Sequence, residues 1–221
     1  MPVKGAPAVS DRCAPPVAAT IERVVEFLRP LAGPSPQARC VVLIGGCSRA
    51  GKTWLSDAVC ARMESLGVAA RRVPLDAWLI GVDRRPSVST VLERYEGPRI
   101  VEAVRALTEG RPVSPPMYDP ATRRRIAEEA AAPLHFASGM LLVDGVIALA
   151  LPGLRRLAAA RIYVSAPDPV RLERLRAFCR DVKGLGDEAE SVIRAREAEE
   201  VPFIKRTRRW ADLIFEAGAG A

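Results

Sequence analysis

One segment of eight residues constrains the fold of this chain more than any other. The segment Gly46-Cys47-Ser48-Arg49-Ala50-Gly51-Lys52-Thr53 satisfies the pattern G-x-x-x-x-G-K-[ST]. It follows the apolar run Cys40–Ile44, which predicts a buried strand, and it opens the segment Lys52–Leu66, which predicts a helix. The glycines let successive N–H groups point at phosphate oxygens, and the helix N-terminus adds positive potential. A chance glycine-rich turn is the alternative, but the flanking strand and helix favour a phosphate-binding loop (P-loop).

This loop predicts specific roles for a nucleoside triphosphate, ATP or GTP, and for Mg²⁺. Lys52 is expected to reach the β- and γ-phosphates, and Thr53 to give its hydroxyl oxygen to the metal. Asp144 follows the apolar run Met140–Val143 and supplies the second acid that such a metal site needs. Alternatively, Asp144 caps the next helix.

Two further features predict catalytic groups. Asp76 closes the predicted strand Ala69–Leu75, at the sheet edge where open α/β sheets bind ligands, and it can act as a general base. A turn or cap residue is the alternative. Four arginines follow the predicted helix start at Asp168 and are candidates for a lid over the transferring phosphoryl group, with a solvated helix face as the alternative: Arg171, Arg174, Arg176 and Arg180.

The remaining pattern predicts an α/β fold of the P-loop NTPase type, in three layers. Besides the strands already named, apolar runs at Arg161–Val164 and Asp212–Phe215 give a five-stranded parallel sheet with helices on both faces. Helical periodicity marks Gly97–Thr108 and a segment that starts at Thr20. We expect residues 1–19 to form a mobile arm and residues 20–221 to form one domain.

Composition narrows the function. The net charge is +7 and only four of the 33 basic residues are lysines, a balance that suits a polyphosphate ligand. Eleven dispersed aromatic residues are too few to indicate a nucleic-acid partner. No apolar stretch approaches the ~20 residues that span a bilayer, and five scattered cysteines predict reduced thiols, so we expect a cytoplasmic protein without a membrane partner.

Several stretches together resemble the uridine kinase and phosphoribulokinase family of P-loop kinases, over about Val41 to Phe215. Beyond the loop, they are Leu75-Asp76-Ala77-Trp78, Gly110-Arg111-Pro112-Val113 with Pro116-Met117-Tyr118-Asp119, Val143-Asp144-Gly145-Val146, Arg180-Asp181-Val182-Lys183-Gly184 and Trp210-Ala211-Asp212-Leu213-Ile214. The resemblance implies a nucleoside-kinase-like fold with an Arg-rich lid, and a small molecule as substrate. Family members are often oligomeric, which leaves a homo-oligomer open.

The resemblance also implies residue roles. Asp76 would be the catalytic base, Trp78 would lie against the substrate, and Tyr118 would contact its base. Glu96 stands about where the family has an acid that binds ribose hydroxyls.

Departures from the family pattern bear on the acceptor. Where the family has a base-reading His, this chain has Ala121-Thr122-Arg123-Arg124-Arg125. Arg123 offers only donors, which favours a carbonyl, carboxylate or phosphate. Asp144-Gly145 replaces the usual Glu-Gly, and Lys183-Gly184 replaces an Arg-Gly pair.

These observations predict an ATP-dependent kinase that phosphorylates a hydroxyl of a nucleoside or related ribosyl metabolite. A sugar, sugar phosphate, pantothenate-like acid or specialised metabolite is the alternative acceptor. A nucleotide-binding regulatory NTPase is a further alternative, although the chain has no Asn/Thr-Lys-x-Asp motif that would read a guanine base.

Overall fold

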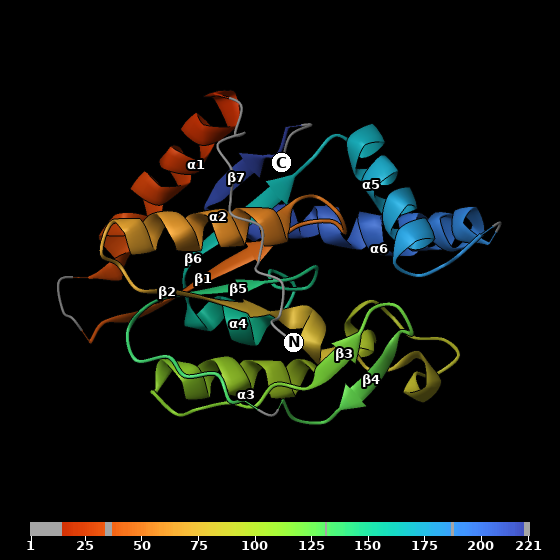
Figure 1. The fold of residues 1–221 in the computed structure, drawn as a ribbon, viewed down its shortest axis with the longest axis horizontal. Coiled ribbons are helices and arrows are strands. Elements are labelled where there is room, and N and C mark those ends of the chain that lie inside the picture. The colour runs from red at the N-terminus through yellow and green to blue at the C-terminus, as the bar shows by residue number, and fades with distance from the viewer. Residues whose placement is uncertain (1–14, 34–36, 131, 187, 219–221) are drawn as a thin grey trace, which may run out of the picture.

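The computed structural model describes residues 15–33, 37–130, 132–186 and 188–218, and it shows an α/β fold (Figure 1). The helices of this described part are α1 Pro15–Leu28, α2 Lys52–Ser65, α3 Gly97–Thr108, α4 Pro152–Leu157, α5 Asp168–Asp181 and α6 Ala189–Thr207. The strands are β1 Arg39–Gly45, β2 Ala70–Pro74, β3 Met117–Asp119, β4 Arg124–Ala127, β5 Gly139–Asp144, β6 Ala158–Ser165 and β7 Leu213–Glu216.

The main sheet has five parallel strands, as the sequence predicts, and their order is β2-β5-β1-β6-β7. The central strand β1 lies between β5 and β6, with Ile44 in register with Asp144. On the other side of β5, Pro74 of β2 is also in register with Asp144. Because these strands end together, the loop after β1 lies beside Asp144 and the residues that follow β2.

Alternating side chains of the buried strands build two cores, one on each face of the sheet. Val42 and Ile44 belong to the core that includes α1 and α2 residues such as Leu55. Val41 and Leu43 belong to the opposite core, with residues of α3, α4 and α6. Figure 1 shows α1 and α2 on one side of the sheet and α3 and α4 on the other. The predicted three-layer sandwich is confirmed.

Three parts of the fold differ from the prediction or were absent from it. Helix α1 begins at Pro15 rather than Thr20, so residues 15–19 are helical; the mobility of the arm 1–19 stays a prediction, and residues 1–14 lie outside the described part. The antiparallel hairpin β3–β4 and the long helix α6 were not predicted. The assignment of residues 20–221 to one domain stays a prediction. Within the described residues, no helix combines the length and apolar character that crossing a membrane requires.

Candidate active site

The P-loop joins β1 to α2 through backbone conformations that constrain its sequence. Gly46 has φ 141° and Gly51 has φ 101°, both in the region that favours glycine. A Cβ atom at Gly46 would lie 2.3 Å from the carbonyl oxygen of Val164 in β6, closer than atoms can approach. Arg49 also has a positive φ, 63°, and its guanidinium stacks 3.4 Å from the centre of the Phe178 ring in α5. The loop is therefore held against both β6 and α5.

Lys52 lies at the centre of this loop. Its Nζ donates a hydrogen bond of 2.8 Å to the carbonyl oxygen of Cys47, and its side chain is buried. Burial lowers the pKa of Lys52, while the negative charges of Asp76 and Asp144 oppose that shift. The three residues that the sequence assigned to phosphate, base and metal roles thus interact electrostatically with one another.

Thr53 and Asp144 also meet, as a shared metal site requires. Thr53 Oγ1 donates to Asp144 Oδ2 at 3.4 Å, and Asp144 is only 4% exposed. Burial raises the pKa of Asp144, against the effect of the adjacent Arg72. The guanidinium of Arg72 contacts both Thr53 Oγ1, at 3.3 Å, and Asp144 Oδ2, at 3.2 Å. This oxygen pair already holds a cationic group, so its chemistry fits Mg²⁺.

Asp76 stands exposed in the short turn Leu75–Trp78 that follows β2. The Tyr95 hydroxyl donates to its Oδ1 at 3.5 Å, and Tyr95 is held there by a backbone bridge to Leu79. Burial and the charge of Asp76 raise the pKa of Tyr95 well above its usual value, which keeps this donor neutral. Sequence reasoning did not select Tyr95, although it is adjacent to the predicted Glu96.

Arg196 of α6 is a second residue that sequence reasoning missed. It lies in the field of Asp76 and Tyr95, and its Nη2 is 3.7 Å from Glu200 Oε2, one helical turn further on. An arginine and a glutamate four residues apart are common on any charged helix, so no sequence pattern distinguishes this pair.

The predicted substrate residues are placed differently from one another. Trp78 is 1% exposed and packs in the core beside α3, and its contact with substrate stays a prediction. Glu96 lies 3.0 Å from Arg125 Nη1, an ion pair that engages its carboxylate. Tyr118 and Arg123 lie on either side of the β3–β4 turn, and Arg85 interacts with both. The substrate roles of Glu96, Tyr118 and Arg123 stay predictions.

The four lid candidates do not form one cationic group. Arg171 is 1% exposed and pairs with Asp168 and Glu197, which ties α5 to α6; its role over the phosphoryl group stays a prediction. The other three have separate contacts: Arg174 with the Gly218 carbonyl at 3.2 Å, Arg176 with Glu190 at 2.6 Å and Arg180 with Asp181 at 2.8 Å. Their contacts with phosphate stay predictions.

Lys183, in the segment after α5, is a further cation near the loop. Burial, aided by the positive charges of Arg196, Arg123 and Arg49, lowers its pKa to about 8. Its Nζ lies 5.3 Å from the centre of the Phe178 ring, on which Arg49 also stacks. The sequence identified the segment through the family pattern but not this side chain.

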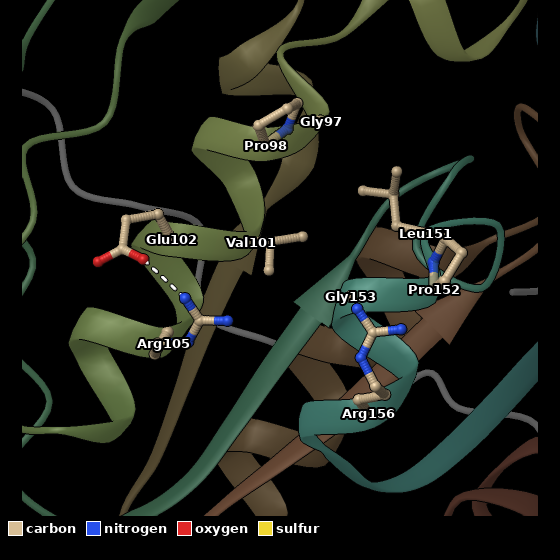
Figure 2. A pocket seen from close by; sticks show the side chains of 9 residues that line it. All are labelled: Gly97, Pro98, Val101, Glu102, Arg105, Leu151, Pro152, Gly153 and Arg156. Carbon is tan, nitrogen blue, oxygen red and sulfur yellow. Dashed lines mark hydrogen bonds and ion pairs between the residues drawn. The ribbon is translucent and has the colours of Figure 1, made fainter.

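A separate pocket of about 480 Å³ lies between α3 and α4 (Figure 2). Val101 and Leu151 form apolar parts of its wall, and Arg105 and Arg156 stand beside them. None of the described residues that line it belongs to the predicted site.

Comparisons with known proteins agree with this geometry. The model of the "Phosphoribulokinase / Uridine kinase family" matches residues 95–220, more than half of the chain. The chain belongs to this family. Similar relatives include the uridine kinase of Latilactobacillus sakei subsp. sakei (strain 23K), 26% identical over 194 residues that cover 82% of this chain and 88% of the relative. The uridine kinase of Staphylococcus carnosus (strain TM300) is 28% identical over 191 residues, with the same two coverages.

Solved structures show the same phosphoribulokinase and uridine kinase type of fold. A proposed fructose transport system kinase from Silicibacter sp. TM1040 aligns with a TM-score of 0.66 and 20% identity, over 88% of this chain and 98% of that one. A proposed uridine kinase from Bacillus stearothermophilus aligns with a TM-score of 0.61 and 19% identity, over 90% and 99%. Family membership makes this chain a P-loop kinase, a phosphotransferase of a family that uses a nucleotide and Mg²⁺.

Proposed function

We propose that this kinase transfers the γ-phosphoryl group of ATP to a hydroxyl of a nucleoside or related ribosyl metabolite. GTP is the alternative donor. The relatives named uridine kinase, which align over about four fifths of the chain, support this acceptor class. The observation that carries the proposal is the exposed carboxylate of Asp76, which lies beside Tyr95 and in the electrostatic field of Lys52.

In this proposal, each residue contributes through its position. The backbone of residues 46–53 binds the phosphates, and Lys52 neutralises charge that develops on the transferred group. Asp76 orients the acceptor hydroxyl and accepts its proton, while Tyr95 holds the carboxylate in place. Thr53 and Asp144 would hold Mg²⁺, and the bound metal would neutralise part of the negative charge of the phosphates.

The acceptor side is formed by residues next to this carboxylate. The strand β3, which carries Tyr118, lies against the Leu75–Trp78 turn that carries Asp76. A substrate placed between Tyr118 and the P-loop would therefore bring a hydroxyl to Asp76. Such positioning supplies much of the rate enhancement in phosphoryl transfer.

The test is an ADP-release assay with ATP and Mg²⁺ against nucleosides, pentoses, sugar phosphates and pantothenate. We expect uridine or another nucleoside to raise turnover well above the rate with water. Asp76→Asn is expected to lower the acceptor-dependent turnover by a factor of about 100 or more, because the acceptor hydroxyl loses its base. The affinity for ADP is expected to be unchanged. Turnover by Asp76→Asn equal to that of the wild type would refute the role of Asp76.

A specific observation favours a second candidate, an acceptor that carries a phosphate or carboxylate. Arg85 and Arg123 both lie near Tyr118, where the family has a histidine that reads a pyrimidine. Arg85 Nε donates to the Ile80 carbonyl at 2.6 Å, and the Val82 N–H donates to the Arg123 carbonyl at 2.9 Å, which fixes both residues near the turn. Guanidinium groups bind anionic oxygens in bidentate fashion.

The same ADP-release assay distinguishes the two candidate classes of acceptor. A pentose phosphate that outperforms every nucleoside, and loses that advantage in Arg123→Gln, would select the anionic acceptor. A nucleoside preference that Arg123→Gln leaves intact would select the first candidate.

A further inference from the structure

The side chains assigned to Mg²⁺ contact a cation supplied by the chain itself. Arg72 Nε lies 2.8 Å from Asp144 Oδ1, and its Nη2 lies 3.2 Å from Asp144 Oδ2 and 3.3 Å from Thr53 Oγ1. Thr53 in turn donates to Asp144. One guanidinium therefore engages both residues assigned to Mg²⁺.

The strand register explains how Arg72 reaches this point. Arg72 stands two residues before Pro74 in the edge strand β2, and Pro74 is in register with Asp144. Arg72 is in register with Leu142, whose side chain belongs to the core beneath α2, so Arg72 lies on the side of the sheet covered by α2, which carries Thr53. Arg71 lies on the opposite face and is exposed.

The nearly buried carboxylate of Asp144 needs such a partner when no metal is bound. A buried carboxylate without a compensating cation is disfavoured in its charged form. Arg72 is 26% exposed in its side chain and provides this partner through a bidentate contact to the carboxylate.

Mg²⁺ and this guanidinium would compete for the same oxygens, because both are cations and Nη2 already contacts Thr53 Oγ1 and Asp144 Oδ2. A second carboxylate offers the guanidinium another position. Asp57, one turn along α2 from Thr53, has its Oδ1 3.5 Å from Arg72 Nη1, and its side chain is 60% exposed. Arg72 can pair with Asp57 after a small rotation toward solvent.

We propose that Arg72 holds the metal site in the metal-free protein and withdraws to Asp57 when Mg²⁺ binds. Arg72 is thus a positioning residue that competes with the metal and sets the Mg²⁺ concentration at which the site fills. The proposal rests on the assignment of Thr53 and Asp144 to Mg²⁺ under the proposed function.

The experiment measures binding rather than turnover. The Kd of ADP is determined by calorimetry with EDTA and with saturating Mg²⁺. The first value divided by the second is the coupling ratio, which reports how strongly the metal favours ADP binding. Arg72→Met keeps the length of the side chain and removes its charge. We expect the coupling ratio of this variant to exceed that of the wild type about tenfold, because the metal no longer displaces a cation.

Arg71→Met is the matched control, since it removes the same charge from the neighbouring position on the other face. It is expected to leave the ratio unchanged. An equal increase in Arg71→Met would show a general charge effect and overturn the proposal, as would an unchanged or lower ratio in Arg72→Met.

Asp57→Asn tests the withdrawal step. We expect it to lower the coupling ratio in the wild-type background and to have no effect in the Arg72→Met background. Equal effects in both backgrounds would show that Asp57 acts on the metal directly, which overturns the withdrawal.

Asp144→Asn distinguishes failure of this proposal from failure of the metal assignment. If Mg²⁺ strengthens ADP binding in the wild type, this effect is lost in Asp144→Asn, and Arg72→Met matches the wild type, only the role of Arg72 fails. If Mg²⁺ has no effect on ADP affinity in any variant, the metal assignment fails and the role of Arg72 fails with it.

Discussion

The hydroxyl of Tyr95 lies 3.5 Å from Oδ1 of Asp76, across 19 positions of sequence. The two residues belong to separate short turns, which a backbone bridge between Leu79 and Tyr95 brings together. A neutral phenol in this position can hold the carboxylate without neutralising it.

Replacement of this phenol tests its positioning role. Tyr95→Phe removes one hydrogen bond to a charged group, so we expect kcat to fall about tenfold, with the KM for ATP unchanged. Steady-state kinetics and a thermal melt of the same preparation measure this. A fall in melting temperature with unchanged kcat would show that the hydroxyl is structural only.

Arg171 is expected to stabilise the junction of α5 and α6 and not the transition state. Because Arg171→Met leaves Glu197 without its buried partner, we expect the free energy of unfolding to fall by about 2–4 kcal/mol. Urea denaturation measures this. Arg176→Met, which removes an exposed ion pair of the same helix, is the control and should unfold close to wild type. A stable Arg171→Met protein with a lowered kcat would instead support the predicted role of Arg171 over the phosphoryl group.

We expect Lys183 to give nucleotide binding a pH dependence. Its pKa in the free protein is about 8, below the usual 10.5, and a bound phosphate would raise it by favouring the charged form. Below pH 8 the lysine is protonated before and after binding; above pH 8 it must take up a proton, so ADP affinity should fall as the pH rises. Calorimetry in buffers of different ionisation enthalpy should detect proton uptake near pH 8.5.

Lys183→Arg is the control for this titration, because guanidinium stays charged throughout that range. We expect ADP affinity in this variant to be independent of pH between about 8 and 9.5. Proton uptake equal to that of the wild type would assign the titration to another group.

Gly46 is expected to be irreplaceable for steric reasons. Gly46→Ala places a Cβ atom against the Val164 carbonyl, so we expect a loss of about 3 kcal/mol or more in stability, or loss of ADP binding if the loop moves instead. Gly67→Ala is the matched control: Gly67 also has a positive φ, 77°, but nothing lies within 4 Å of its added Cβ, and the expected cost is about 1 kcal/mol. Equal losses in the two variants would contradict the steric argument.

The sequence predicted the sheet and the phosphate loop because both depend on local patterns. The run Cys40–Ile44 is apolar on both faces, and the loop that follows has fixed spacing, so neither needs knowledge of distant contacts. Arg72 was missed because its significance depends on Asp144, 72 residues away, and on the register of two strands. Family resemblance predicted that Trp78 lies against the substrate. Its burial could not be predicted from the sequence, because it depends on how α3 packs against the turn that carries Trp78.

The lid was predicted from the number of arginines, and this local reasoning did not predict their carboxylate partners. A cluster of arginines on one helix does not reveal which carboxylates of the next helix will pair with them. Glu190 and Glu197 of α6 pair with Arg176 and Arg171, while Arg196 of the same helix lies near Asp76. The partners of each guanidinium are fixed by the packing of α5 against α6.

The hairpin β3–β4 forms its own two-stranded sheet, and within the described residues its strands are not part of the five-stranded sheet. The residues predicted to bind phosphate and metal and to act as base lie after β1, after β2 and at the end of β5, whereas Tyr118 and Arg123 belong to the hairpin and its turn. If these two residues contact the acceptor as proposed, substitutions in the hairpin would change the choice of acceptor without altering the five-stranded sheet that carries the phosphate loop. Acceptor specificity could then diverge among related kinases while the folding core is inherited unchanged.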